Sequence, residues 1–584
     1  MVDSQACVRS KPDAVIPEPW LEKLTGNAPV QVPTFLVNPF INGGCGMSRV
    51  PIDQTVSGVE ATSKEPSGVW LALLFVVVVI LIFTLREWQD GIVLWGLLFL
   101  VGRSRRIYAI SIVLLFTVSF PPYSWPTSWF CLGPMMWMWR DQAVKLSRLR
   151  ITAEAIAIGF TMGWTSTGFV RAGLPAFGEL VHAAARLVFS LQFLAVAVAI
   201  RILRNQQIVV AAVTTAAVAV VGELLEAWFG VSWSVSNFAL TVAATPLAQW
   251  SRWITPFGVA GLLYFVNFLL SPDRSERAVR RWMGPAIGVG VLGAAWYGGA
   301  LIAANTYIAP LSFSSLLVQP HLKVADNEPW RPWLKLDQLT RASMVERSEI
   351  DLIVWPESCL SASWSDEQEL RCNDMATQLT VQDFSRLLTP VYRTNCLFGV
   401  VIGDRGTTQR YGLAVVEVRR YNCGCLVSKS GDVRRHDKLD LVPFKEGIPA
   451  LLDTQWMRNH VLPALQINQP LNYGRNYAPL SFRDVDGKRH LIAVSVCYES
   501  WLPWLAQYRD TTVDAIIHLV YDGNTANHPG MMERHIRACQ YRAIETRKWN
   551  LVCSTWAGTA IIDPNGQIVR QLPAVAGVLR TDTL

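Results

Sequence analysis

The stretch Leu491-Ile-Ala-Val-Ser-Val-Cys497-Tyr-Glu-Ser is a β-rich run that ends at a cysteine. A second run, Asp351-Leu-Ile-Val-Trp-Pro-Glu357, ends at a carboxylate, because the proline cannot continue the hydrogen-bond ladder of a strand. From about residue 316 onward, runs of this kind alternate with helix-like stretches, which predicts a layered α/β fold. Functional side chains gather at strand ends in such folds.

The expected strands are short apolar runs between turn-forming residues. They are Asp351–Trp355, Cys396–Gly403, Gly412–Val418, His490–Val496, Ala515–Val520 and Asn550–Ser554. The expected helices between them include Arg371–Leu388 and Met531–Thr546.

The preceding part of the chain has a different composition. Hydrophobic residues make up 51% of the 584 residues and charged residues only 17%, against about 25% in an average soluble domain. The apolar residues are concentrated in successive segments, which are Val69–Leu85, Gly91–Gly102, Ile107–Phe120, Trp125–Trp139, Glu154–Val170, Ala183–Ile200, Ile208–Phe229, Pro256–Leu270 and Gly284–Ile308. Such a series predicts a polytopic helical membrane bundle.

We therefore expect a polar cytoplasmic tail at residues 1–66, a transmembrane bundle of about nine segments at 67–308, and a catalytic domain at 309–584. Basic residues fall on every second link, at 103–106, 140–150, 201–204 and 274–281. Because cytoplasmic links are enriched in Lys and Arg, this alternation places residues after 308 outside the cytoplasm.

Other function classes find little support in the sequence. A net charge of +7 on 584 residues gives no basic footprint for nucleic acid. Cys423 and Cys425 lie near His436, but one short cysteine pair is weak support for a metal site, and no zinc-ribbon spacing is present.

Three charged or nucleophilic residues are the catalytic candidates: Glu357, Lys438 and Cys497. Each alone has an ordinary explanation, as a surface carboxylate, a solvated ammonium or a small buried hydrophobe. Together they are sufficient for acyl transfer, since a carboxylate can take the thiol proton and an ammonium can stabilise the oxyanion that forms. This chemistry requires no metal and no cofactor.

The order strand-Pro-Glu, then Lys438 followed by Leu-Val-Pro-Phe, then strand-Cys-Tyr-Glu resembles the carbon–nitrogen hydrolase (nitrilase) superfamily. With a preceding membrane bundle, the chain is similar to the bacterial apolipoprotein N-acyltransferases. The likeness extends to Ser119–Pro126, Pro246–Gln249, Phe257–Gly261, Tyr421-Asn422, Gly431, His535, Arg542–Glu545 and Asp563–Gly566. It implies a nitrilase-like α-β-β-α sandwich after the membrane bundle.

The resemblance implies that Glu357 is the general base, Cys497 the nucleophile and Lys438 the oxyanion stabiliser, aided by the backbone N–H of Tyr498. It implies supporting roles for Glu446 and Glu499, which would orient Lys438 or assist proton transfer. The acyl donor would be a membrane phospholipid and the acceptor a diacylglyceryl-modified apolipoprotein. The implied location is the bacterial cytoplasmic (inner) membrane, with the catalytic domain on its outer side.

The sequence departs from the family pattern at His518–Asn524 and Cys553–Gly558, where the family has Asn-, Arg- and Trp-containing stretches. Substrate choice is the property that these departures affect. Two alternatives therefore stay open: a membrane-anchored amidase that gives the acyl group to water, and a catalytically silent protein that binds lipids or lipoproteins.

Overall fold

The computed structural model shows two regions. The first consists of helices, and the second contains the strands. The described residues are 109–110, 112–113, 115–116, 125–142, 147–166, 178–229, 237–271, 278–322, 331–345, 349–359, 363–365, 388–410, 413–449, 452–464, 470–475, 478–509, 511–523 and 529–581. The predicted segments Val69–Leu85 and Gly91–Gly102 and most of the predicted helix Arg371–Leu388 lie outside them.

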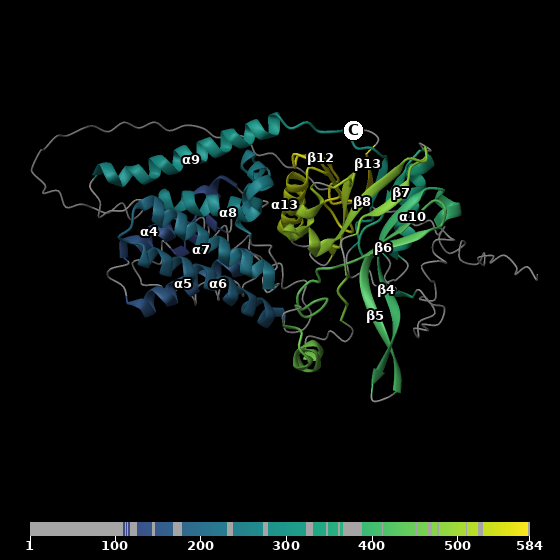
Figure 1. Ribbon diagram of the computed structural model, residues 1–584, viewed down its shortest axis with the longest axis horizontal. Helices are drawn as coiled ribbons and strands as arrows, with labels where there is room; N and C mark the ends of the chain where they lie inside the picture. Colours follow the sequence, from purple (N-terminus) through teal and green to yellow (C-terminus); the bar gives the residue numbers. More distant parts are fainter. Residues whose placement is uncertain are drawn as a thin grey trace, which may run out of the picture. The chain divides into compact units, whose positions relative to one another are not determined.

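The first region is helical. Its longer elements are α4 (Gly133–Gln142), α5 (Arg148–Ser166), α6 (Gly178–Ile202), α7 (Ile208–Phe229), α8 (Ser251–Leu269) and α9 (Ala278–Ala304), with short 3-10 helices η4 (Trp125–Trp129), η6 (Phe238–Val242) and η7 (Pro246–Trp250). Helices α5, α6, α7 and α8 pack against one another in sequence order (Figure 1).

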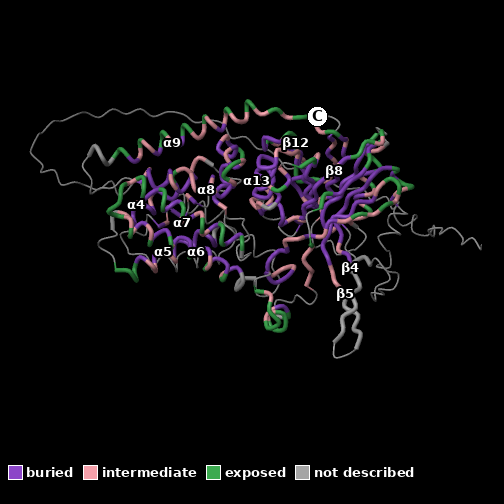
Figure 2. The backbone as a smooth tube through the Cα atoms, in the orientation of Figure 1, coloured by how far each residue is buried: buried purple, intermediate pink, exposed green. Residues whose placement is uncertain are grey.

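Three of these helices are long and apolar enough to cross a membrane, over His182–Ile202, Ile208–Trp228 and Trp282–Ala304. Large apolar side chains on them are nevertheless exposed, including Leu191, Val213, Val221 and Val289. Only 17% of the Trp282–Ala304 window is buried, and Figure 2 shows exposed and partly exposed residues along α9. Exposed apolar helix faces of this extent are typical of contact with lipid.

The predicted single segment Trp125–Trp139 is wrong as one helix. The structure divides it into η4 and α4, separated by a turn. The Asn267 side chain of α8 explains the break, because its Oδ1 accepts hydrogen bonds from the backbone N–H groups of Leu132 (2.9 Å) and Gly133 (3.2 Å). Asn267 thereby pairs the Leu132 N–H before the first turn of α4, while the Gly133 N–H also donates to the Phe130 carbonyl (3.0 Å).

The second region contains two β-sheets. The seven-stranded sheet has the order β13-β1-β2-β4-β5-β6 with β3 beside β4, and the six-stranded sheet has the order β12-β11-β10-β9-β8-β7. The strands of the first sheet are β1 (Ser315–Gln319), β2 (Leu352–Val354), β3 (Ser363–Ser365), β4 (Asn395–Arg410), β5 (Leu413–Val427), β6 (Val433–Asp437) and β13 (Gly577–Arg580). Those of the second are β7 (Leu480–Arg483), β8 (Arg489–Val496), β9 (Ala515–Val520), β10 (Trp549–Ser554), β11 (Ala560–Ile562) and β12 (Ile568–Gln571).

Three apolar cores separate four layers in this region. Leu317, Val354 and Leu397 of the first sheet pack with Val494 and Leu519 of the second, so this core lies between the sheets. A second core joins the other face of the first sheet to α10 (Arg331–Val345). The third joins the second sheet to α13 (Pro529–Thr546). The layers therefore follow the order α-β-β-α, which confirms the sandwich expected for this region.

Candidate active site

The three catalytic candidates each follow the end of a strand. Glu357 lies three residues after β2, Lys438 directly follows β6, and Cys497 directly follows β8. The strands β2 and β6 belong to one sheet and β8 to the other. The structure thus brings together residues that are up to 140 positions apart in the sequence, at one end of the layered sheets.

Glu357 approaches β4 so closely that only glycine fits opposite it. A Cβ atom at Gly399 would lie 2.3 Å from the Cα of Glu357, and the Gly399 N–H donates to the Pro356 carbonyl (3.1 Å). The position of the carboxylate is therefore fixed by backbone contact as well as by its own side-chain bonds.

A buried network of charges surrounds Lys438. Its ammonium lies 2.8 Å from Glu446 Oε2 and 3.5 Å from Glu357 Oε1. The Asn422 Nδ2 group donates to both carboxylates, at 2.7 Å to Glu357 and 2.9 Å to Glu446. Glu357 Oε2 is buried and accepts no hydrogen bond within the described part of the chain, so this oxygen is available to take a proton.

Cys497 is held in an unusual backbone conformation. Its φ is +49°, in the left-handed region that non-glycine residues seldom adopt, where the chain leaves β8 and enters the 3-10 helix η11 (Cys497–Trp501). Ser500 Oγ donates to the Cys497 carbonyl (2.8 Å) and lies 2.6 Å from His535 Nε2 on α13. These contacts stabilise the turn that presents the thiol.

Exposure distinguishes Cys497 from the other cysteines that the structure describes. Cys497 is partly accessible, whereas the remaining described cysteines are buried: Cys131, Cys359, Cys396, Cys423, Cys425, Cys539 and Cys553. A nucleophile must be reached by its substrate, and a structural thiol need not be.

The charges of the three candidates act on one another. Burial raises the pKa of the Cys497 thiol well above its ordinary value, and the charge of Glu357 raises it further, while Lys438 and the backbone N–H of Tyr521 lower it. The thiol is therefore neutral at rest and needs a base before it can attack a carbonyl.

The ammonium of Lys438 remains charged despite its burial. Burial alone lowers the pKa of Lys438, but the charges of Glu446 and Glu357 outweigh this effect and raise it. Burial likewise raises the pKa of Glu446, and Lys438 outweighs this effect so that the pKa falls below its ordinary value. A fixed positive charge thus lies beside a neutral thiol and a carboxylate with a free oxygen, which is an arrangement suited to acyl transfer.

The other supporting residues occupy different places. Glu446 contacts Lys438 directly. Glu499 instead accepts hydrogen bonds from the backbone N–H groups of Leu439 (2.7 Å) and Val496 (2.6 Å), and from His436 (3.2 Å). Glu499 therefore connects the segment after Lys438 to the end of β8, directly before Cys497. Tyr498 is buried and belongs to the apolar cluster that also contains residues of α4–α9.

Sequence reasoning assigned no role to Asn422, Gly399 or the backbone N–H of Tyr521. Asn422 lies in the middle of β5, opposite Val401. Its signals in the sequence were its place in the Tyr421-Asn422 part of the family likeness and its polar side chain inside an otherwise β-forming run. No group of three or more metal-binding side chains occurs within the described ranges, and Cys423 and Cys425 are buried thiols on β5.

The two segments that depart from the family pattern bind each other. Asp522 Oδ1, after β9, accepts hydrogen bonds from Ser554 Oγ (2.5 Å) and the Trp556 N–H (3.0 Å). Trp556 stacks on His321, with ring centroids 3.7 Å apart. The residues of these two segments therefore form one continuous network beside the end of β9, which Tyr521 follows.

Comparison with known families finds a match over the region that contains these residues. Residues 317–582 match the carbon–nitrogen hydrolase family, and they contain Glu357, Lys438 and Cys497. The solved structure of Nit3 from Saccharomyces cerevisiae, a nitrilase-superfamily member, is similar at 15% identity, with a TM-score of 0.33, over 46% of this chain and 88% of that one.

The helical region matches a narrower family. Residues 113–269 match the apolipoprotein N-acyltransferase N-terminal domain. An apolipoprotein N-acyltransferase of Pseudomonas syringae pv. tomato is 24% identical over 451 residues, or 74% of this chain and 81% of its own. Apolipoprotein N-acyltransferase 2 of Treponema denticola is 25% identical over 271 residues, which are 45% of this chain and 48% of that protein, so the match spans about half of its length. The resemblance to bacterial apolipoprotein N-acyltransferases is confirmed in both regions.

Proposed function

We propose that this protein is a membrane N-acyltransferase that moves a fatty acyl group from a phospholipid to the N-terminal diacylglyceryl-cysteine amine of apolipoproteins. One observation carries the proposal. The turns that bear Lys438 and Cys497 contribute Val442, Tyr498 and Trp501 to the same apolar cluster as the helices α4–α9. A thiol site joined to apolar helices suits an acyl donor that resides in a membrane.

The first half-reaction would form a thioester. Glu357 Oε2 takes the Cys497 proton, and the thiolate attacks the ester carbonyl of the phospholipid. The resulting oxyanion is stabilised by the Lys438 ammonium and the backbone N–H of Tyr498. When the tetrahedral intermediate collapses, the lysophospholipid alkoxide leaves and takes the proton from Glu357.

The second half-reaction would transfer the acyl group. The lipoprotein amine attacks the thioester carbonyl while Glu357 accepts one of its protons, and Lys438 again stabilises the oxyanion. Cys497 leaves as a thiolate and recovers the proton from Glu357, so that the free enzyme is regenerated. Glu446 holds Lys438 in place, and Glu499 fixes the two turns that carry Lys438 and Cys497.

The proposed placement follows from the distribution of apolar and basic residues. Residues 67–308 would form the transmembrane bundle, 1–66 a cytoplasmic tail, and 309–584 the catalytic domain on the outer side of the cytoplasmic membrane. The exposed apolar faces of α6, α7 and α9 support contact with lipid. The basic residues at 274–281, which fall in the link after α8 and at the start of α9, support a cytoplasmic position for that end of both helices.

Complementation tests the function directly. The gene is expressed in a bacterium depleted of its own lipoprotein N-acyltransferase, and mass spectrometry then measures the lipoprotein N-terminus. We expect growth to be restored and the N-terminal cysteine to gain one amide-linked acyl chain. The Cys497→Ala variant is the matched negative control.

The hydrolase alternative makes a different prediction in the same assay. A membrane-anchored amidase of the carbon–nitrogen hydrolase class would release fatty acid to water and leave the lipoprotein diacylated. Free fatty acid without acylated lipoprotein would therefore overturn the transferase proposal and favour this alternative. A protein that neither acylates lipoprotein nor releases fatty acid would be the silent lipid-binding homologue.

A further inference from the structure

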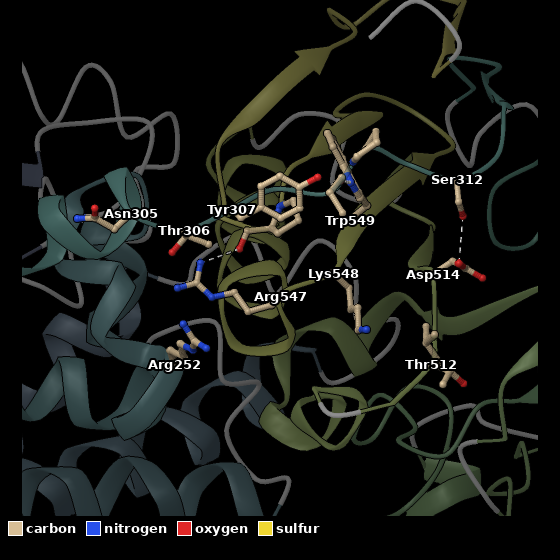
Figure 3. A pocket seen from close by; sticks show the side chains of 14 residues that line it. Arg252, Asn305, Thr306, Tyr307, Ser312, Thr512, Asp514, Arg547, Lys548 and Trp549 are labelled. Atoms are coloured by element: carbon tan, nitrogen blue, oxygen red, sulfur yellow. Dashed lines mark hydrogen bonds between the residues drawn. The ribbon is translucent and has the colours of Figure 1, made fainter.

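A pocket of about 670 Å³ lies away from the candidate catalytic residues. It is bounded by the start of α8, the chain that follows α9, and the segments that precede β9 and β10 (Figure 3). Arg252, Arg547 and Lys548 are the basic residues of its lining, and Asn305, Thr306 and Ser312 add neutral polar groups.

The two guanidinium groups carry positive charge that the pocket does not neutralise. Arg547 donates through Nη1 to Asn565 Oδ1 (2.6 Å) and the Pro564 carbonyl (3.3 Å), but its Nε and Nη2 atoms are buried without a hydrogen-bond partner in the described chain. Arg252 lies beside it (Figure 3), over the ring of Trp253 with its Cζ 5.4 Å from the centroid.

Like charges lie close to Arg547. Burial lowers the pKa of Arg547 to about 10, and the charges of Arg252 and Arg509 lower it further, with Asp563 acting in the opposite direction. Asp514, the carboxylate of the lining, is already engaged, because it accepts hydrogen bonds from Ser312 Oγ (3.0 Å) and the Leu491 N–H (2.8 Å). An anion in the pocket would relieve the repulsion and satisfy the buried donors.

The surroundings of the pocket suit a membrane surface. The pocket lies at the start of α8 and beyond the end of α9, whereas the basic residues at 274–281 lie at the end of α8 and the start of α9, which are the opposite ends of these two helices. Trp253 is 56% exposed and Tyr307 83% exposed at this end. Exposed Trp and Tyr residues at helix ends are typical of the headgroup level of a bilayer.

The pocket is separated from Cys497 by the length of a strand. Val513 and Trp549 line it at the amino-terminal ends of β9 and β10, whereas Tyr521, whose N–H contacts the Cys497 sulfur, follows the carboxyl end of β9. Six residues at roughly 3.3 Å each place about 20 Å between these ends. A group bound in the pocket is therefore not the acyl ester that Cys497 attacks.

We propose that this pocket binds the phosphate of an anionic phospholipid headgroup, as a second lipid site distinct from that of the acyl donor. Arg547 and Arg252 would bind the phosphate oxygens, and Asn305 and Thr306 would contact the glycerol portion of the headgroup. The proposal rests on the proposed membrane location but not on the acyl-transfer chemistry.

Lipid titration of the purified full-length protein in detergent tests this site. Phosphatidylglycerol or phosphatidylcholine is added, and the midpoint of thermal unfolding is followed by tryptophan fluorescence. We expect phosphatidylglycerol to stabilise the protein at a concentration at least about tenfold lower than phosphatidylcholine does. Equal effects of the two lipids would overturn the anionic assignment, and a full effect of inorganic phosphate alone would overturn the lipid assignment.

Matched variants locate the effect. Arg252→Gln and Arg547→Gln should each weaken the phosphatidylglycerol response by about tenfold or more. Arg252→Gln removes no hydrogen bond of the described chain, so it keeps the test valid if Arg547→Gln fails to fold. Arg393→Gln is the control, because Arg393 is exposed and has nearly the same φ (+54°) as Arg547 (+57°).

Arg393→Gln should respond as the wild type does, and an unchanged response in Arg252→Gln would refute the site. The Cys497→Ser variant should keep the full phosphatidylglycerol response although it cannot transfer acyl groups. Failure of the lipid site and failure of the proposed function are thereby distinguished.

Discussion

At the scale of single residues, Cys497 combines partial accessibility with a left-handed backbone and a neighbouring carboxylate. Cys497→Ser should lose acyl transfer almost completely, because a carboxylate base cannot readily deprotonate a hydroxyl. Intact-protein mass spectrometry after incubation with phospholipid should find a hydroxylamine-labile acyl adduct on the wild type only. Cys539→Ala, which removes a buried thiol, is the control, and an adduct that maps to Cys539 or Cys553 would contradict the assignment.

The partners of Cys497 make separable contributions to the same reaction. Glu357→Gln should abolish thioester formation, since an amide cannot accept the thiol proton.

Lys438→Ala should reduce the rate by about 10²–10³, the usual effect of removing one oxyanion stabiliser. Single-turnover acylation by phospholipid measures both variants, and a Lys438→Ala rate near that of the wild type would exclude this lysine from the oxyanion site.

We expect Asn422 to act as a positioning residue, because its side-chain amide donates to the carboxylates of both Glu357 and Glu446. Asn422→Ala removes the donor shared by Glu357 and Glu446, and we expect acylation to fall by about 10–100-fold as the two like charges separate. Asn472→Ala, which removes a hydrogen bond to the Arg420 carbonyl on the same sheet, is the control. Equal losses in both variants would point to general destabilisation instead of positioning.

Asp522 gives the folded protein a specific dependence on pH. Burial raises the pKa of this carboxyl from its ordinary 3.8 to about 6, against the hydrogen bonds from Ser554 and the Trp556 N–H. The folded state thus holds the proton more tightly than the unfolded state, so stability falls as pH rises from about 4 to about 6, by at most about 3 kcal/mol.

The Asp522→Asn variant should remove this loss, because the amide does not ionise. The difference in unfolding midpoint between Asp522→Asn and the wild type should therefore increase from pH 4 to pH 6 and then level off. Thermal unfolding across this range measures the difference. Asp432→Asn, at an exposed carboxylate within a turn, is the control, and the same pH-dependent difference in that variant would contradict the role of Asp522.

At the scale of elements, the position of Glu357 depends on the contact between the turn after β2 and strand β4. Gly399→Ala should displace Glu357, because the new methyl group would lie 2.3 Å from its Cα atom. We expect a large loss of acylation and a destabilisation of about 1–3 kcal/mol, the range typical of overpacking. Gly290→Ala in α9, where a Cβ atom meets no neighbour within 4 Å, should retain activity. Activity of Gly399→Ala equal to that of Gly290→Ala would contradict this argument.

The elements that sequence reasoning predicted are mostly central and apolar. Strand β9 has the predicted bounds Ala515–Val520, and β8 and β10 begin one residue earlier than predicted. The edge strands β6, β7, β12 and β13 were not predicted, and neither were β3 and the buried inner strands β1 and β11. The polar run Val-Arg-Arg-His-Asp of β6 is typical of an edge strand that faces solvent, whereas β1, β3 and β11 are only three to five residues long. The predicted helix Met531–Thr546 corresponds to α13, which begins two residues earlier.

Sequence reasoning also missed residues of the candidate site, but for a different reason. Glu357 and Cys497 could be found because each follows a predicted strand, and Lys438 because it precedes Leu-Val-Pro-Phe in the order that resembles the family. Asn422 and Gly399 lie inside long strands, and their importance depends on which strands become neighbours. Periodicity within one strand carries no information about that pairing.

At the scale of the whole molecule, the two regions are joined by buried polar contacts as well as by the chain. The Tyr541 hydroxyl of α13 donates to the Ala239 carbonyl in η6 (2.7 Å), and the Gln249 amide donates to the Asn565 carbonyl (2.7 Å). Both contacts involve residues between α7 and α8, a part of the chain with few basic residues. A catalytic domain that rests on this end of the helices would lie on the side opposite the basic links.

This arrangement predicts the compartment of the catalytic domain. A reporter that is active only outside the cytoplasm, fused after Leu584, should be active, since the last basic link precedes α9 and α9 is long enough to cross the membrane. The same reporter fused within 272–277 should be inactive, and a cytoplasmic reporter at that position should be active. Activity of a cytoplasmic reporter after Leu584 would mean that the number of crossings differs by one from the proposed topology. The catalytic domain would then face the cytoplasm, where it could not reach lipoproteins that mature on the outer side of the membrane.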